Sequence, residues 1–144
     1  MSGKTIKEDD QYTVIQSGDG SELCLNWNHI DRLSINDFKK GITEFVNQCK
    51  THKPIHAVID ARNLDKNSPA FGWVSGQQKF EGEEEYMSWW TREVAPGYNN
   101  SRIATVAVAT GNPNSPGELN ELPQGVNFKM GYFNSLEDAR NWRP

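Results

Sequence analysis

Two runs of nearly continuous apolar residues predict strands in the interior of a sheet. The first is Ile55–Ile59, which follows Pro54 and ends in a charged turn at Asp60 and Arg62. The second is Ile103–Ala109. Runs of this length and composition are typical of strands that are buried on both faces in α/β proteins. We therefore predict that these two strands lie next to each other in the middle of the sheet.

Alternating apolar and polar positions predict the other strands. Leu23–Trp27 alternates with a period of two, and Tyr12–Ile15 precedes it across a glycine-containing turn. This arrangement is typical of a β-hairpin. Phe128–Tyr132 alternates in the same way and predicts a last strand. Residues 1–10 are polar and show no periodicity, so we expect a flexible N-terminus there and a single domain over residues 11–144.

Apolar positions three and four residues apart predict a long helix before the first interior strand. Ser34 is a candidate N-cap with Asp37 at the capping-box spacing, and Pro54 prevents further winding. We expect Gly41 to allow this helix to approach the sheet closely. The apolar stripe consists of Ile35, Phe38, Ile42, Phe45, Val46 and Cys49.

A second helix is predicted over Glu83–Val94. Its three leading glutamates suit the positive end of the helix dipole, and Pro96 and Gly97 mark its predicted end. Trp89 and Trp90 are separated by about 100° around this helix. We therefore do not expect both indoles to point into one core.

The order of the predicted elements defines a fold class. Ser135 caps a last short helix, a helical turn is expected near residues 70–78, and the rest of residues 63–82 and 111–126 shows no clear pattern. A hairpin followed by alternating helices and strands predicts an α/β fold. We expect a mixed, mostly parallel five-stranded sheet with an N-terminal β-hairpin and helices packed on it.

Composition narrows the classes of partner. The chain has 144 residues, of which 24% are charged, and a net charge of −4 with a pI near 5.4. This balance gives no electrostatic reason to expect nucleic acid or an anionic membrane as a partner. No apolar stretch approaches the ~18 residues of a membrane-spanning helix, and no signal peptide is recognisable. We expect a cytoplasmic protein without a transmembrane segment.

Cysteine and histidine residues show no ligand spacing. Cys24 and Cys49 lie in a strand and on a helix face, so we expect two buried thiols that are not bonded to each other. His52 and His56 are separated by a helix end and Pro54, which excludes a ligand pair on one helix. No known phosphate, metal or nucleophile motif occurs. We expect no metal site and no cofactor.

Several short segments carry a resemblance in combination. They are the helix Phe38–Cys49, the strand and turn Val58–Leu64, the strand start Arg102–Ala104, and Tyr132–Ala139 followed by Trp142. Together they resemble small bacterial proteins whose fold is shared by STAS domains and CRAL-TRIO lipid-binding domains. STAS names the sulfate-transporter and anti-sigma-factor-antagonist module. The resemblance covers about residues 10–143, and it implies a binding or regulatory module rather than an enzyme.

Two features depart from that family. In anti-sigma-factor antagonists a phosphorylatable Ser or Thr lies just after the central strand, whereas Ala61 follows Asp60 here and the next hydroxyl is that of Ser68. This departure weakens the implication of a phosphorylation switch. The segment Gly72–Glu85 is also longer than usual, which makes any pocket there particular to this protein.

Candidate binding residues follow the central strand. Asp60, Arg62 and Asn63 lie where open α/β sheets meet their ligands, and arginine offers a forked donor for anionic groups. The alternative is that Asp60 caps a turn while Arg62 pairs with a surface acid. Ser68 belongs to the same segment.

Trp73 and Trp89 are the aromatic candidates. They can line an apolar pocket or form an exposed anchor for a protein partner. The alternative is that they pack inside the core beneath a long insertion.

We predict a non-enzymatic module, because no nucleophile–base pair and no metal site can be assembled from these motifs. The leading hypothesis is protein–protein regulation of the STAS type through the surface around residues 60–68 and the following helix. The alternative is a carrier that holds a small apolar or lipid-like ligand between the helix at residues 83–94 and the sheet. Formation of a homodimer is left open.

Overall fold

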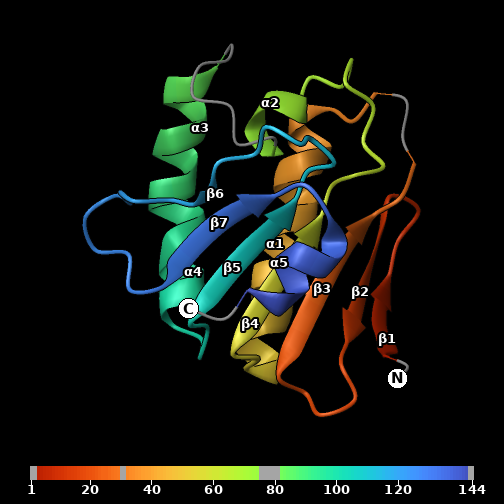
Figure 1. The fold of residues 1–144 in the computed structure, drawn as a ribbon, viewed down its shortest axis with the longest axis vertical. Helices are drawn as coiled ribbons and strands as arrows, with labels where there is room; N and C mark the ends of the chain where they lie inside the picture. The colour runs from red at the N-terminus through yellow and green to blue at the C-terminus, as the bar shows by residue number, and fades with distance from the viewer. Residues whose placement is uncertain (1–2, 30–31, 75–81, 143–144) are drawn as a thin grey trace.

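Seven strands form one mixed sheet in the computed structural model, which describes residues 3–29, 32–74 and 82–142 (Figure 1). Their order in the sheet is β1-β2-β3-β4-β5-β7-β6. β3, β4, β5 and β7 pair in parallel, whereas β1, β2 and β6 pair antiparallel with their neighbours. The strands are β1 (Lys4–Glu8), β2 (Tyr12–Gln16), β3 (Glu22–Trp27), β4 (His56–Asp60), β5 (Thr105–Ala109), β6 (Gly117–Glu118) and β7 (Lys129–Phe133).

The α/β class is confirmed, and so is the central pair of adjacent strands, β4 and β5. The predicted count of five strands is wrong, and the sheet is only partly parallel. β1 lies where a flexible N-terminus was expected over residues 1–10, and β6 lies in an unassigned loop. Both are edge strands with mostly polar side chains. Such strands leave little hydrophobic signal in a sequence, and only Ile6 of β1 packs against the core.

Helix α1 (Ile35–His52) forms as predicted. The hydroxyl of Ser34 accepts a hydrogen bond of 3.1 Å from the backbone N–H of Asp37, which caps the first turn. The predicted stripe from Phe38 to Cys49 is buried against the sheet. A Cβ at Gly41 would lie 2.3 Å from the ring of Trp27 in β3. Glycine therefore permits the close contact between α1 and the sheet.

The helix after residue 82 runs further than predicted. α3 (Glu83–Trp89) continues without a break through a π-helical segment, η1 (Trp90–Val94), into α4 (Ala95–Asn99). The predicted end at Pro96 and Gly97 is therefore wrong. Pro96 lies in the first turn of α4, directly after the π-helical segment. Gly97 packs against Val46 of α1, since a Cβ there would lie 2.2 Å from the Val46 side chain.

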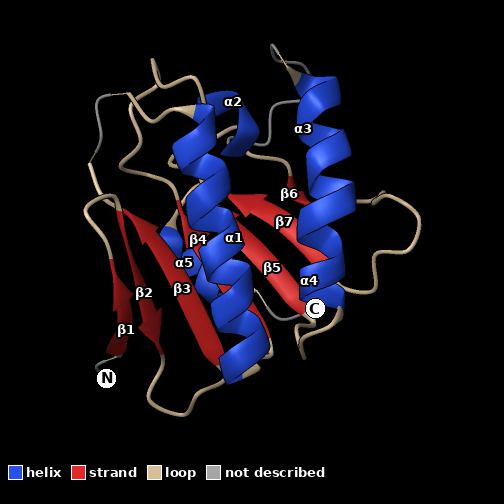
Figure 2. Cartoon of the chain, turned by 180° about the vertical axis from the view of Figure 1, so that it is seen from behind, coloured by secondary structure: helices blue, strands red, loops and turns tan. Residues whose placement is uncertain are grey.

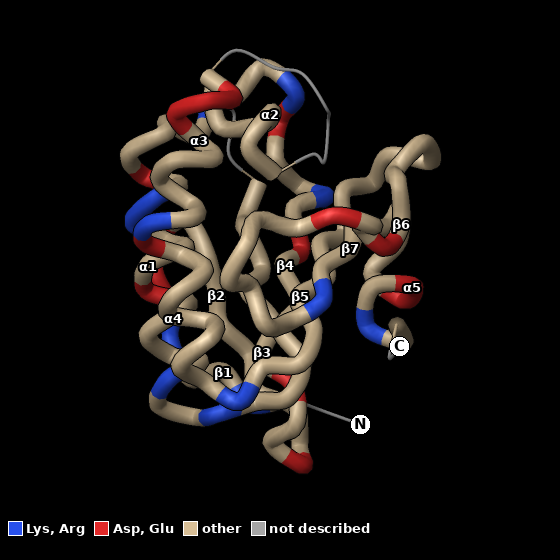
Figure 3. The backbone as a smooth tube through the Cα atoms, turned by 90° about the vertical axis from the view of Figure 1, so that its left-hand side faces the viewer, with Lys and Arg blue, Asp and Glu red and all other residues tan. Residues whose placement is uncertain are grey.

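Helices cover both faces of the sheet, but unequally. α1 and the α3–η1–α4 helix lie over one face (Figure 2), together with the short α2 (Phe71–Val74) at one end. On the other face, α5 (Leu136–Asn141) is the only helix among the described residues, which gives three layers in the side view of Figure 3. α5 contacts β4, β5 and β7. β1 and β2 have no helix in front of them on this face (Figure 1).

Trp89 and Trp90 are both buried in the same core cluster, which contradicts the expectation that both indoles would not point into one core. Trp89 faces Phe38 of α1, with 6.0 Å between ring centroids, whereas Trp90 faces Phe128 beside β7 at the same separation. The helix is enclosed on two sides, so two directions about 100° apart both point into the core.

Candidate functional site

Asp60 ends β4 and is held by its own neighbour in the chain. The guanidinium group of Arg62 donates hydrogen bonds to both oxygens of the buried Asp60 carboxylate, with Nε 2.8 Å from Oδ1 and a terminal nitrogen 2.9 Å from Oδ2. The backbone N–H of Arg62 also donates to Oδ1. The hydrogen bond to Asp60 is the main cause that raises the pKa of Arg62 above its usual value. The partner of Arg62 is thus Asp60 itself, rather than a separate surface acid.

Ser68 is buried and its hydroxyl has a structural contact. Its Oγ accepts a hydrogen bond of 2.9 Å from the backbone N–H of Leu33, which joins the turn after β4 to the segment before α1. A kinase needs an exposed hydroxyl, so this position does not suit phosphorylation in the folded state. Asn63 lies exposed at the end of β4.

A polar hollow opens on the α5 side of the sheet, beside Asp60. Asn26 of β3 is the register partner of Asp60, so both side chains leave the sheet on the same face at the carboxyl ends of their strands. The hollow has a volume of about 220 Å³. Ile15 and Leu136 supply apolar walls, and the polar lining comes from Ser17, Glu22, Cys24, Asn26, Asp60 and Arg140.

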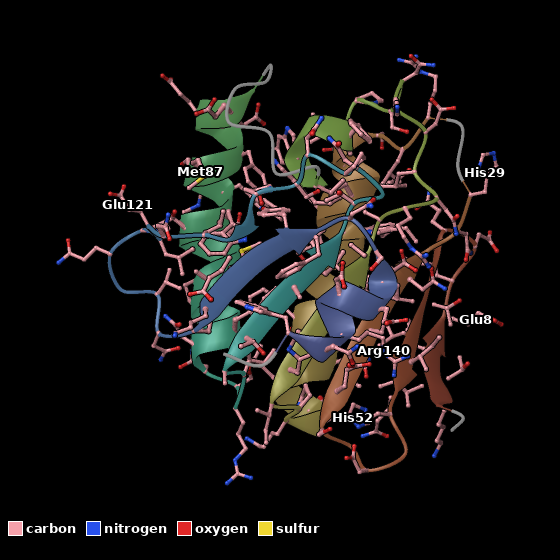
Figure 4. The ribbon with its side chains drawn as sticks, viewed as in Figure 1. Glu8, His29, His52, Met87, Glu121 and Arg140 are labelled. Carbon is pink, nitrogen blue, oxygen red and sulfur yellow. The ribbon has the colours of Figure 1, made fainter. Side chains whose placement is uncertain are left out.

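A second acid–arginine pair closes the opposite end of this hollow. The buried Glu22 carboxylate of β3 accepts a hydrogen bond of 2.9 Å from Nε of Arg140 in α5. Figure 4 labels Arg140 on α5, in front of the sheet. The hollow is therefore bordered by two carboxylates and the guanidinium group of Arg140, and each acid is fixed by its own arginine.

Acidic groups affect the pKa of the Cys24 thiol more strongly than basic groups do. Burial is the largest cause that raises the pKa of the Cys24 thiol to about 12, and the carboxylates of Asp60 and Glu22 follow in that order. The opposing effects of Arg140 and Arg62 are smaller than those of the two acids. A positively charged group is consequently favoured over a negative one at this position.

The hollow contains one buried hydrogen-bond acceptor that has no partner. The carbonyl oxygen Oδ1 of Asn26 is inaccessible to solvent and meets no donor in the described part of the chain. Most buried polar atoms in proteins are paired, and an unpaired one costs about 1–3 kcal/mol. A ligand that brings N–H donors would satisfy this oxygen once neighbouring atoms move enough to expose it.

Trp73 and Trp89 lie on the other face of the sheet, in a cluster of aromatic side chains with Phe38 and Tyr86 that we call the aromatic chamber. They are only 1% and 4% exposed, which agrees with the alternative of core packing and not with that of an exposed anchor. Each lines a cavity of about 20 Å³ between α1, α3 and the sheet, which has room for about one water molecule. Nε1 of Trp73 and Oη of Tyr98 find no partner within the described ranges. An apolar ligand would fit only if these helices moved apart.

Asp60 is the one residue of the hollow that was among the predicted site residues. The polar residues that β3 and α5 contribute were not: Glu22, Cys24, Asn26 and Arg140. The first three occupy alternate positions of β3, and the alternation was visible in the sequence. It indicated a polar strand face without showing that this face borders a hollow. Arg140 carried no signal, because its partner Glu22 lies 118 residues away.

Both thiols are free and buried, as predicted, and we expect them to resist labelling in the native protein. At pH 8, a thiol with a pKa of about 12 instead of the ordinary value of 9.0 has a thiolate fraction about a thousandfold lower. Burial raises the pKa of Cys49 as well. Rates of reaction with a chromogenic disulfide, compared with and without urea, test this. Rapid native labelling of either thiol would contradict the described burial.

The raised pKa of Cys24 also affects stability. An unfolded thiol begins to ionise near pH 9, while the folded one stays protonated until about pH 12. Its contribution to stability is therefore complete below pH 9 and is lost as the pH rises through 12.

Comparison with known proteins adds no family. No protein-family model, no curated protein and no solved structure matches the chain. The resemblance to STAS and CRAL-TRIO domains therefore stays a prediction. No described helix is long and apolar enough to cross a membrane. Within the same residues, no three His, Cys, Asp or Glu side chains are placed to hold a metal ion.

Proposed function

We propose that this protein is a binding module for a small cationic amine, held in the hollow between β3 and α5. The observation that carries this proposal is the buried Oδ1 of Asn26, the register partner of Asp60, which meets no donor among the described residues. An ammonium group brings the N–H donors that this oxygen needs. It also carries the charge that the acidic groups around Cys24 favour.

The size and walls of the hollow define the rest of the ligand. A volume of about 220 Å³ is below the range of about 300–1,000 Å³ for drug-sized ligands, so the amine is compact. Ile15 and Leu136 favour a short apolar body next to the ammonium group. Arg140 at the far end is half exposed and leaves room for solvent or a polar tail.

The side chains around the hollow suit ligand binding rather than catalysis. The Cys24 thiol is held protonated, which makes it a poor nucleophile. His56 lies behind the hollow, where its ring nitrogens contact the hydroxyl of Thr105 and the carbonyl oxygen of Ala139. This histidine is engaged in joining β4, β5 and α5. We therefore retain the proposal of a non-enzymatic binding module.

The two functions inferred from the sequence have less support. The first is regulation through a partner surface around residues 60–68. The hydroxyl of Ser68 is buried and cannot contact a partner there, whereas Arg62 and Asn63 are exposed and can. A carrier of apolar ligands would use the aromatic chamber, whose cavity of about 20 Å³ first has to expand.

Calorimetric titration with n-butylammonium chloride tests the proposal, with n-butanol as the neutral comparison. We expect saturable binding of the cation and much weaker binding of the alcohol. Asn26→Leu should weaken binding of the cation by about tenfold or more, because a hydrogen bond to a charged group contributes about 1.5–3 kcal/mol. Asn36→Leu is the matched control, since Asn36 is exposed on α1.

Stability separates a binding role of Asn26 from a structural one. Asn26→Leu replaces an unpaired buried polar atom with an apolar group. We expect its melting temperature to equal or exceed that of the wild type. Equal affinity of Asn26→Leu and the wild type, or equal affinity of butanol and butylammonium, would overturn the proposed function.

A further inference from the structure

An ammonium group already lies on two tryptophan rings at the outer edge of the aromatic chamber. Nζ of Lys39, in α1, is 5.5 Å from the ring centroid of Trp73 and 5.8 Å from that of Trp89. The two indole rings are 5.8 Å apart and inclined by 39°. These distances are those of cation–π interactions, in which a cation lies over the electron-rich ring face.

A carboxylate completes the surroundings of this cation. Oε1 of Glu85, in α3, lies 3.6 Å from Nζ of Lys39. The lysine thus bridges α1 to α2 and α3 through two aromatic faces and one acid. Aromatic faces with a nearby carboxylate form the kind of site that recognises alkylammonium groups in other proteins.

The contacts of Lys39 are of a kind that is readily exchanged. Its side chain is partly exposed, and that of Glu85 is mostly exposed. Ion pairs and cation–π contacts at exposed sites are individually weak. The lysine stem is flexible, so Nζ can leave the rings while the backbone of α1 stays in place.

An open concavity gives access to this position from solvent. It has a volume of about 650 Å³, and both Lys39 and Trp89 lie in its lining. Three basic and three acidic side chains border it: Lys7, Lys39, Lys40, Asp9, Glu44 and Glu93. Their charges balance only when the ammonium group of Lys39 is included. Once the ammonium of Lys39 moves away, acidic groups predominate and favour another cation.

We propose that Trp73, Trp89 and Glu85 form a second binding site, which is specific for an alkylammonium group. In the free protein the ammonium group of Lys39 fills this site, and a ligand can displace it. This site is independent of the hollow beside Asn26, because it lies on the opposite face of the sheet. It also differs in chemistry. The hollow needs N–H donors, whereas aromatic faces bind a fully methylated ammonium that has none.

Titration with choline chloride tests this proposal, followed through the indole N–H resonances of Trp73 and Trp89. Lys39→Ala removes the ammonium group from the two indole rings, so choline no longer has to displace it. We expect this variant to bind choline about tenfold or more tightly than the wild type does. Lys40→Ala removes the same charge from the border of the concavity without freeing the rings, so its gain in choline affinity should be much smaller than that of Lys39→Ala. Lys39→Gln, which keeps most of the stem, should reproduce the gain if Lys39→Ala is poorly folded.

A neutral isostere separates a cation site from an apolar hole. We expect 3,3-dimethylbutan-1-ol, which has the shape of choline without its charge, to bind Lys39→Ala about tenfold or more weakly than choline does. Equal affinities for the two compounds would overturn the proposal. So would equal choline affinity of the Lys39 and Lys40 variants, or the lack of saturable binding to both Lys39 variants.

The same variants distinguish two sources of the ligand. A short peptide that carries one trimethyllysine is compared with free choline on Lys39→Ala. Tighter binding of the peptide indicates a modified protein as the natural source, and tighter binding of choline indicates a small molecule. Either order supports the alkylammonium site.

Discussion

Replacing Val58 by Asp is expected to unfold the protein at room temperature. Val58 is fully buried in the middle of β4, on the face that packs against α5. Its neighbours there are Cys24, Ala107, Ala109 and Ala139, none of which can pair with a carboxylate. An unpaired buried charge costs several kcal/mol, which is comparable with a total stability of about 5–15 kcal/mol.

Circular dichroism and thermal melting measure this effect. Ile55→Asp is the matched control, because Ile55 precedes the same strand but is 56% exposed. We expect this control to remain folded. A folded Val58→Asp protein with the melting temperature of the wild type would refute the position of β4 inside the sheet.

Replacing Trp73 by Ala is expected to lower the stability by about 3–5 kcal/mol, as large-to-small substitutions of buried aromatic residues do. Trp73 packs against Tyr86, Trp89 and Phe38, with ring centroids 5.1–5.9 Å apart. For a chain of this size, the loss corresponds to a decrease of about 10 °C or more in the melting temperature.

Met87→Ala is the control for that measurement, because Met87 is among the exposed large apolar side chains, on α3 (Figure 4). Its melting temperature should change by a few degrees at most. If Trp73→Ala melted like the wild type, the indole would not be a core residue. The earlier hypothesis of an aromatic anchor for a partner would then regain its basis.

Local signals in the sequence were sufficient for the central elements of the fold. The Ser34 cap and the stripe from Phe38 to Cys49 are properties of one segment, so α1 could be predicted without knowledge of its surroundings. The apolar runs that became β4 and β5 are equally local. The predicted bounds of these two strands agree with the observed bounds to within a few residues.

Elements that depend on their neighbours were missed. β1 is stabilised by pairing with β2 rather than by an apolar face of its own, apart from Ile6. The helix continues past Pro96 because the π-helical turn before it changes the hydrogen-bond pattern: the N–H of Ala95 bonds to the carbonyl oxygen of Trp90. Neither circumstance is visible in residue order alone.

The candidate site was predicted in part. Asp60 was found because it ends an interior strand, and it does border the hollow. Asn26 was seen only as a polar position of an alternating strand. Its importance depends on the short α5, which covers β4 and β5 and leaves the face beside β3 open (Figure 1). That opening results from the packing of distant segments, and no local pattern encodes it.

The central claim is that the hollow beside Asn26 binds a small cationic amine. Its most direct test is a titration of the isotope-labelled wild-type protein with n-butylammonium chloride, followed by amide and side-chain NMR shifts. We predict saturable shifts of the Asn26 side-chain amide and of the Asp60 and Arg140 backbone amides, with little change at Trp73 and Trp89. Shifts confined to other residues, or no saturable shift at Asn26, would contradict the claim.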